Sequence, residues 1–266
     1  VAQIGCRSGL SSAGLMVAVY GRRFARLPIA LNIVQLLGWG AFELVVMRDA
    51  TVAVGRHGGA MTASYWPYAA TLLWGAVILL LLGGSMVRLV RRIVHRVALP
   101  LVVLSLLWLS WQFLSMAQSQ GLATLWSRGG DGSMSALSAL DLVIAMPISW
   151  LPLVADYARH GKGNRSALTG TWTGFAVANV WCYGLGVLVA LTLPSQDLIV
   201  ALLQAQGGLI ALSLVLIDEV DNAYGDNYSA AVSAHSIAPR WSIRRWGLLI
   251  ATACTLLTLV LPMHSL

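Results

Sequence analysis

Long apolar stretches alternate with short polar ones along the entire chain. Four stretches carry no Asp, Glu, Lys or Arg, namely residues 58–87, 97–127, 166–196 and 198–217. A helix needs roughly 20 apolar residues to cross the hydrocarbon core of a bilayer, so several stretches can cross and still leave a loop. No stretch shows the alternation of a β-strand. The pattern therefore predicts a bundle of membrane-spanning helices.

The hydropathy pattern divides the chain into about eight spanning segments, which indicates an all-α polytopic membrane protein. We expect a single transmembrane domain over residues 1–266. The predicted spans are Ala2–Tyr20, Pro28–Val52, Trp66–Gly84, Val97–Met116, Leu137–Tyr157, Leu168–Leu193, Gly207–Ser233 and Trp246–Pro262.

The composition supports this fold class. Hydrophobic residues make up 58% of the chain and charged residues 10%, whereas soluble domains carry about 25% charged residues. So few charges cannot cover a surface that faces water, so most of the surface must face lipid. The net charge of +7 does not indicate nucleic acid, because the basic residues fall in short loops between the spans.

The basic residues also favour one orientation. Lys and Arg gather in alternate loops, and the positive-inside rule places these loops in the cytoplasm. We therefore expect the protein in the inner (plasma) membrane of the cell. The loops expected in the cytoplasm contain Arg22, Arg23 and Arg26, then Arg88, Arg91, Arg92 and Arg96, then Arg159, Lys162 and Arg165, then Arg240, Arg244 and Arg245, and the opposite loops contain at most Arg48, Arg56 and Arg128.

The first of three unusual places is the pair Trp39 and Glu43, which lies inside a predicted span. Their i, i+4 spacing puts an indole and a carboxylate on one helix face. Gln35 lies one turn before them, and Gly38 and Gly40 permit close approach of another helix. An indole stacks on a flat ring and a carboxylate accepts from an amine, so we expect a site for a flat, nitrogen-rich ligand. A structural glutamate that a neighbouring helix satisfies is the alternative.

The second place is the segment 147–152, which begins and ends with proline. Two prolines so close together break the helical hydrogen bonds near mid-span, and a broken helix at this depth is tolerated where it lines a cavity. Freed backbone groups, together with Ser149 and Trp150, are therefore expected to contribute to a substrate site. Asp156 and Arg159 follow at i, i+3 spacing and are interpreted as a gate or anchor, with a solvated surface pair as the alternative.

The third place is the acidic segment 218–229, which follows the apolar run 209–217. That run alone gives about 13 Å of helix, too short to cross, so the helix must continue through the acidic segment. Carboxylates inside a span suit coupling to a cation or a proton. An acidic loop at the membrane interface is the alternative. The residues assigned to coupling are Asp218, Asp221 and Asn222, with a candidate Na⁺ site near Asp221.

Together, the three places resemble the nucleobase–cation symporter family of cytosine, purine, hydantoin and allantoin permeases. The resemblance rests on Gly-Trp-x-x-x-[Gln/Glu] at Gly38–Glu43, Ser-Trp-x-Pro-x-x-x-Asp-Tyr-x-Arg at Ser149–Arg159, and Asp-Glu-x-Asp-Asn at Asp218–Asn222. Tyr20–Phe24 fits the basic loop before the family's third helix. The chain resembles most the hydroxymethylpyrimidine (thiamine-precursor) permeases, and the resemblance covers nearly its whole length.

The resemblance implies a LeuT-like bundle of inverted repeats, of which this chain supplies roughly helices two to nine and lacks the first and the C-terminal helices. In the implied substrate site Trp39 stacks on the ligand, Glu43 replaces an amide ligand and Asp226 replaces an asparagine. Trp150 lies about one turn from the family's second stacking position. The implied function is secondary active transport of a pyrimidine or nucleobase, such as hydroxymethylpyrimidine or cytosine, across the lipid bilayer by symport with Na⁺ or H⁺, without a further cofactor.

Other functions stay open. An amino-acid or polyamine permease of the same fold is the alternative within transport. A membrane sensor or a truncated, non-functional transporter is another, because the chain starts at Val1 and stops just after an apolar run. A membrane enzyme is not expected, because the chain has no HExxH or GxSxG motif and no two histidines pair within a span.

Overall fold

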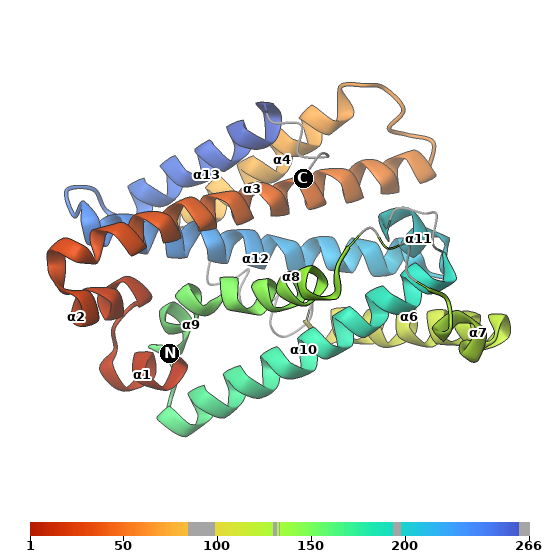
Figure 1. Cartoon of the computed structure of the whole chain (residues 1–266). Coiled ribbons are helices and arrows are strands. Elements are labelled where there is room, and N and C mark those ends of the chain that lie inside the picture. The colour runs from red at the N-terminus through yellow and green to blue at the C-terminus, as the bar shows by residue number, and fades with distance from the viewer. Residues whose placement is uncertain (85–98, 130–131, 133, 194–197, 261–266) are drawn as a thin grey trace. The chain divides into compact units, whose positions relative to one another are not determined.

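The structure is a computed structural model that describes residues 1–84, 99–129, 132, 134–193 and 198–260 (Figure 1). These residues form α-helices, and no strand occurs among them. The predicted loop with Arg88, Arg91, Arg92 and Arg96 lies outside the described residues. The helices are α1 (Ala2–Ser8), α2 (Ser12–Phe24), α3 (Arg26–His57), α4 (Trp66–Leu82), α6 (Leu99–Gln120), α7 (Leu122–Trp126), α8 (Ala136–Ser149), α9 (Leu151–Ala158), α10 (Asn164–Thr192), α11 (Leu198–Gln204), α12 (Gly208–Ile237) and α13 (Ile243–Val260).

Five helical segments in the described part of the chain are long and apolar enough to cross a membrane, namely α3, α6, the consecutive α8 and α9, α10, and α13. α4 is also apolar but shorter. Large apolar side chains on these helices point outward, and Leu137 and Val180 are 80% and 75% exposed. An exposed apolar surface of this extent suits lipid and not water. The chain is therefore an all-α, multi-pass membrane protein, as predicted.

The first predicted span, Ala2–Tyr20, is wrong as a single helix. α1 ends at Ser8 and α2 begins at Ser12. Between them Gly9 has a φ of 68°, a left-handed conformation that commonly ends a helix because glycine adopts it without strain. The N–H group of Gly9 donates to the carbonyl of Gly5 at 2.9 Å and so closes the end of α1.

The acidic segment 218–229 lies inside one helix, which confirms that the helix continues through it. α12 runs from Gly208 to Ile237 and buries Asp226, Ser229 and Ser233. The alternative in which this segment is an interface loop is therefore wrong.

The predicted helix break between the two prolines is confirmed. α8 ends at Ser149 and α9 begins at Leu151. Trp150, which joins them, keeps a right-handed helical conformation (φ −82°, ψ −13°), so the break interrupts hydrogen bonding without reversing the chain. The Ser149 hydroxyl donates to the carbonyl of Met146 at 2.7 Å, and the Leu153 N–H donates to that of Trp150 at 2.9 Å. Two carbonyl groups next to the break are thus satisfied by the chain itself.

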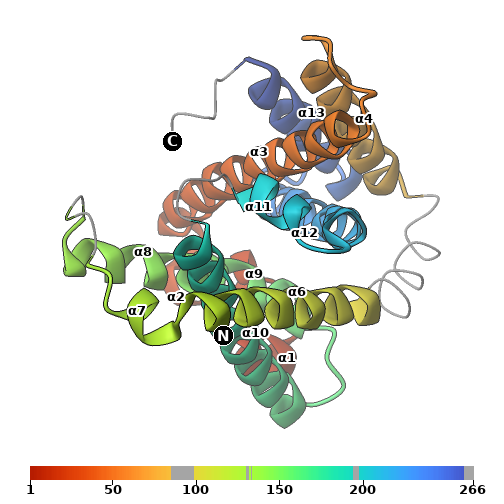
Figure 2. The same cartoon turned by 90° about the vertical axis from the view of Figure 1, so that its right-hand side faces the viewer.

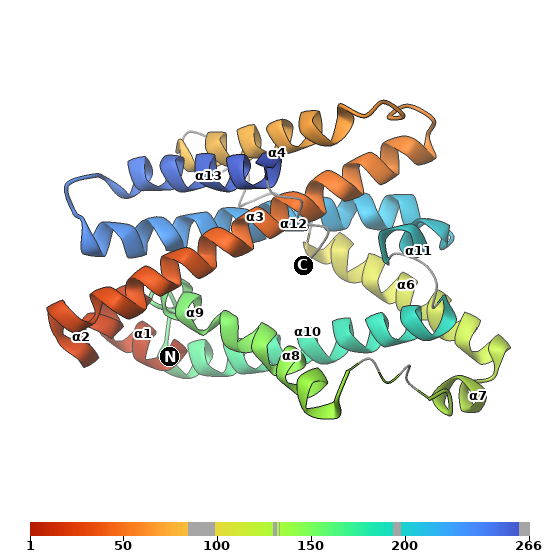
Figure 3. The same cartoon turned by 45° about the horizontal axis from the view of Figure 1, so that its top comes forward.

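The chain divides into two compact units. Unit 1 comprises residues 1–22 and 110–196, and unit 2 comprises residues 23–109 and 197–266. In unit 2, α3 packs along α12, and α4 and α13 pack against both of them (Figures 1 and 3). A Cβ atom on Gly75 of α4 would lie 2.5 Å from Thr255 Oγ1 of α13, so this glycine permits the close packing of the two helices.

Unit 1 is held together by the short N-terminal helix. α1 packs against α9 and α10, and Figure 2 shows it beside α10. A Cβ atom on Gly5 would lie 2.9 Å from the Cβ atom of Ala155, so only glycine allows α1 to approach α9 this closely. The Trp181 indole of α10 donates to Ser110 Oγ of α6 at 2.9 Å.

Candidate functional site

Polar side chains join α3 to α12 in the interior of unit 2. Asn32 Nδ2 donates to Ser233 Oγ at 3.2 Å, and the carboxyl groups of Glu43 and Asp226 lie close to each other. The residue numbers fall along α12 as they rise along α3, so the two helices run antiparallel. All four side chains are buried, and buried polar groups are costly unless they are paired. These contacts therefore fix the faces by which α3 and α12 pack.

The carboxyl pair of Glu43 and Asp226 has three unusual properties. The side chains are only 6% and 2% exposed. Within the described residues, neither has a lysine or arginine partner. Glu43 Oε2 is buried, and no N–H or hydroxyl group of the described residues donates to it. Because an ionised carboxylate can only accept, a hydrogen bond between two such groups needs a proton on one of them.

Asn227 and Cys254 lie beside this pair on α12 and α13. Asn227 Nδ2 donates to the carbonyl of Ala223 at 2.7 Å, and Cys254 Sγ donates to Asn227 Oδ1 at 3.6 Å. Gly40 of α3 packs against both side chains, since a Cβ atom there would lie 3.1 Å from Asn227 Nδ2 and 3.1 Å from Cys254 Sγ. The lack of a side chain at Gly40 thus lets three helices meet next to the carboxyl pair.

Trp39 and Gln35 are half-buried, whereas Glu43 is buried, so the predicted ligand face of α3 lies at the edge of the helix packing. The Trp39 ring meets the Phe42 ring edge-on, with centroids 5.8 Å apart and planes at 87°. Gly38 is exposed, and no atom lies within 4 Å of a Cβ atom built on it. The close helix approach predicted for both glycines is therefore found at Gly40 and not at Gly38.

The residues assigned to cation coupling lie on the half-buried side of α12. Asp218, Asp221 and Asn222 are each partly exposed, and the Asn222 side chain donates to the carboxylate of Glu219. The deeply buried acid of this segment is Asp226. Among the described residues, no group of three or more His, Cys, Asp or Glu side chains is placed to hold a metal ion. The Na⁺ site near Asp221 stays a prediction.

The residues predicted from the broken helix belong to unit 1. Ser149 and Trp150 are half-buried at the junction of α8 and α9. The Trp150 ring meets the Phe175 ring of α10 edge-on, with centroids 6.4 Å apart. Their role in binding substrate stays a prediction.

Asp156 has a structural role in unit 1. Its side chain is 3% exposed, and Oδ1 accepts from the backbone N–H group of Ser12 at 3.0 Å, at the first residue of α2. Arg159 contacts the His160 ring, with Nε and Nε2 3.2 Å apart. The function of Asp156 and Arg159 as a gate stays a prediction.

The Ser12 contact leads to a stability prediction. Asp156→Ala leaves a buried N–H group without its acceptor, and we expect it to lower the free energy of unfolding by about 1–3 kcal/mol. Asp156→Asn is the matched control, because its side-chain oxygen still accepts, and it should lose less. Thermal unfolding of the purified protein in detergent measures both. Equal losses would show that the negative charge matters and not the acceptor.

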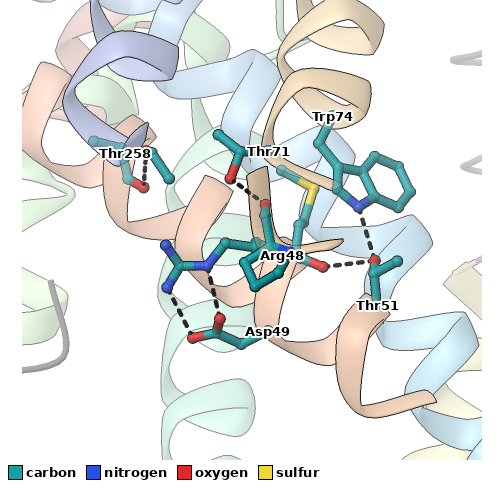
Figure 4. Close-up of polar contacts among 9 residues, drawn as sticks. Arg48, Asp49, Thr51, Thr71, Trp74 and Thr258 are labelled. Carbon is teal, nitrogen blue, oxygen red and sulfur yellow. Dashed lines mark hydrogen bonds and ion pairs between the residues drawn. The ribbon is translucent and has the colours of Figure 1, made fainter. Parts of the chain in front are cut away.

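A second polar feature of unit 2 is a pocket of about 590 Å³ lined by α3, α4, α11 and α13. Arg48 lies there, 7% exposed, and its Nε and Nη2 atoms contact the two carboxylate oxygens of Asp49 at 2.7 and 3.2 Å (Figure 4). The buried hydroxyl groups of Thr71 and Thr258 line the same pocket. The placement of Arg48 and Arg56 in a loop is therefore wrong, because α3 continues through both residues to His57.

Three polar residues were not identified from the sequence as functional candidates. Ser233 and Asn227 lie at the contact of α12 with α3. Ser233 follows Asp226 by two helical turns, so the helical period places both on one face once either is known to be buried. Asp141, an exposed carboxylate in α8, was overlooked although it is an ionisable residue inside a predicted span.

The apolar helices and the buried polar contacts between them define a multi-pass membrane protein with an acidic site in its interior. The chain belongs to the family described as permeases for cytosine/purines, uracil, thiamine and allantoin, whose sequence model matches residues 1–265. The predicted membership of the nucleobase–cation symporter family is thereby confirmed, and this is a family of transporters and not of enzymes. A comparison with curated proteins found no match.

Proposed function

We propose that this permease carries out secondary active transport of a pyrimidine or nucleobase, such as hydroxymethylpyrimidine or cytosine, by symport with Na⁺ or H⁺. The family description supports this substrate class. The distribution of Lys and Arg supports a place in the inner (plasma) membrane, with the loops of Arg22, Arg91, Arg159 and Arg244 in the cytoplasm.

One observation carries the proposal, the buried Oε2 atom of Glu43, to which no N–H or hydroxyl group in the described part of the chain donates. Buried polar atoms in folded proteins nearly always have a hydrogen-bond partner. A buried acceptor without one, inside a membrane-spanning helix, therefore suits a ligand that donates a hydrogen bond. Trp39 lies one turn earlier on α3 and can supply the flat apolar surface on which an aromatic ligand stacks.

A 4-aminopyrimidine edge fits this combination. Its exocyclic amine donates to Glu43 Oε2, and a protonated ring nitrogen next to it can donate a second, charge-assisted hydrogen bond. Uracil carries a carbonyl oxygen in place of that amine and would bring an acceptor against an acceptor, which leaves both desolvated and unpaired. The site thus favours cytosine and 4-amino-5-hydroxymethyl-2-methylpyrimidine over uracil.

The proposal extends to a LeuT-like bundle of inverted repeats. Two pairs of consecutive helices, α3 with α4 and α12 with α13, pack together in unit 2, and a discontinuous helix such as α8–α9 is common at transporter sites. The further assignments are Gln35, Ser149, Trp150 and Asp226 to substrate binding, Asp218, Asp221 and Asn222 to cation coupling with Na⁺ near Asp221, and Asp156 and Arg159 to a gate.

Uptake of radiolabelled cytosine and 4-amino-5-hydroxymethyl-2-methylpyrimidine by cells that express the permease tests this function. Unlabelled aminopyrimidines should compete, and uracil should compete weakly. Trp39→Ala should lower the apparent affinity about 10-fold or more, because stacking of a base on an aromatic ring contributes about 1–3 kcal/mol. Trp39→Phe, which keeps a ring, is the matched control and should lose less.

Competition by amino acids or polyamines, without competition by any pyrimidine, would replace this proposal by the amino-acid permease alternative. Equal affinities for Trp39→Ala and the unmodified protein would remove the indole from the substrate site.

A further inference from the structure

We propose that Glu43 and Asp226 form a proton-binding site and that the proton they share is the ion coupled to transport. This inference rests on the proposed transport function and adds the identity of the coupling ion and of its ligands. It stands on the direct contact of two buried carboxyl groups across α3 and α12.

The contact between Glu43 and Asp226 requires that the negative charge of at least one carboxyl group is neutralised. Two ionised carboxylates in contact repel strongly in a low-dielectric interior, and no lysine or arginine pairs with either group in the described chain. One proton removes the repulsion and supplies the hydrogen bond between the two groups. The close contact of the two carboxyl groups is thus stable with one bound proton and unstable without it.

Among the described residues, the ionisable groups that interact with the pair are acidic, and none of them is a lysine or arginine. α12 brings Glu219, and α13 brings the thiol of Cys254. α11 carries no ionisable side chain, and the ionisable side chain of α4 is Tyr68, which lines the pocket around Arg48. Arg48 is itself neutralised by Asp49, its neighbour on α3. The surroundings therefore favour a bound cation at the pair.

A proton fits this position better than a metal ion. Hard cations take several oxygen ligands, and transporters commonly supply them from unwound backbone. α3 and α12 are regular helices at Glu43 and Asp226, so the backbone carbonyl groups there serve helical hydrogen bonds.

The arrangement also explains how ion and substrate depend on each other. With the proton in place, the two carboxyl groups stay together, and the buried Oε2 atom of Glu43 keeps its position. Loss of the proton makes the two groups repel and disrupts that geometry. Substrate and proton therefore bind together and leave together.

Purified permease in sodium-free proteoliposomes, loaded with a pH-sensitive dye, tests the coupling. Addition of cytosine or 4-amino-5-hydroxymethyl-2-methylpyrimidine outside should lower the internal pH. With one proton per substrate, an inward gradient of one pH unit should support about 10-fold accumulation. Uptake that requires Na⁺ and moves no protons would overturn the inference and leave the proposed transport function intact.

Infrared difference spectroscopy of the purified permease gives a readout that does not need transport. The carbonyl band of a protonated carboxyl group should be present in the unmodified protein and absent from both Glu43→Gln and Asp226→Asn. Asp49→Asn, which alters an ion-paired carboxylate of the same helix, should keep the band. Absence of the band from the unmodified protein would reject the proton site, whereas a band without uptake of any pyrimidine would keep the site and reject the transport function.

Discussion

Replacement of Glu43 by glutamine is expected to lower pyrimidine uptake about 10- to 100-fold. The amide keeps the size of the side chain, and its NH₂ group can still donate to Asp226, so the contact between α3 and α12 survives. The amide oxygen can still accept from the substrate amine, but the variant loses the negative charge and the shared proton of the pair. A hydrogen bond to a charged group contributes about 1.5–3 kcal/mol, against about 0.5–1.5 kcal/mol for a neutral one. Initial uptake rates over a range of substrate concentrations measure the loss.

Asp49→Asn provides the matched control on the same helix. Its carboxylate pairs with Arg48 in the separate pocket, and the asparagine oxygen can still accept from the guanidinium group. Uptake by this variant should stay within about two-fold of the unmodified protein, as for substitutions outside a functional site. Unchanged uptake by Glu43→Gln would support the alternative in which Glu43 only links two helices.

Most of the helices could be predicted because the membrane imposes a minimum length on them. The run 209–217 is too short to cross by itself, and this argument, together with the positive-inside rule, placed the acidic segment inside α12. The span Ala2–Tyr20 failed for the opposite reason. Mean hydropathy averages over Gly9 and its neighbours, whereas a helix can end at a single residue with positive φ.

The acidic site could be predicted as a set of candidates but not as a geometry. Helical spacing limits which residues share a face, yet it does not set the rotation of α12 against α3. The sequence therefore assigned Asp221 to cation coupling and Asp226 to the substrate site without deciding which of them lies against Glu43. The structure buries Asp226 against Glu43 and leaves Asp221 partly exposed. The position of Arg48 was wrong because a basic residue was taken as a loop residue, although pairing with Asp49 lets it stay in a helix.

Gly40→Val is expected to lower both the stability of unit 2 and transport. Even the first side-chain atom would lie 3.1 Å from Asn227 Nδ2 and Cys254 Sγ, and valine adds two methyl groups to it. Overpacking of this kind costs about 1–3 kcal/mol. Since Asn227 directly follows Asp226 on α12, its displacement also disturbs the carboxyl pair. Thermal unfolding in detergent and uptake in cells measure the two effects.

Gly38→Val is the matched control, because it makes the same change two residues away on the same helix where nothing lies within 4 Å. It should leave the unfolding temperature nearly unchanged. Asn227→Ala removes the side chain that valine meets, so the double variant Gly40→Val with Asn227→Ala should lose less stability than the sum of the two single variants. Strictly additive losses of stability in the double variant, or equal losses for Gly40→Val and Gly38→Val, would contradict this prediction. Gly40 would then not be the point where α3, α12 and α13 pack together, and its packing would no longer support the position of the carboxyl pair.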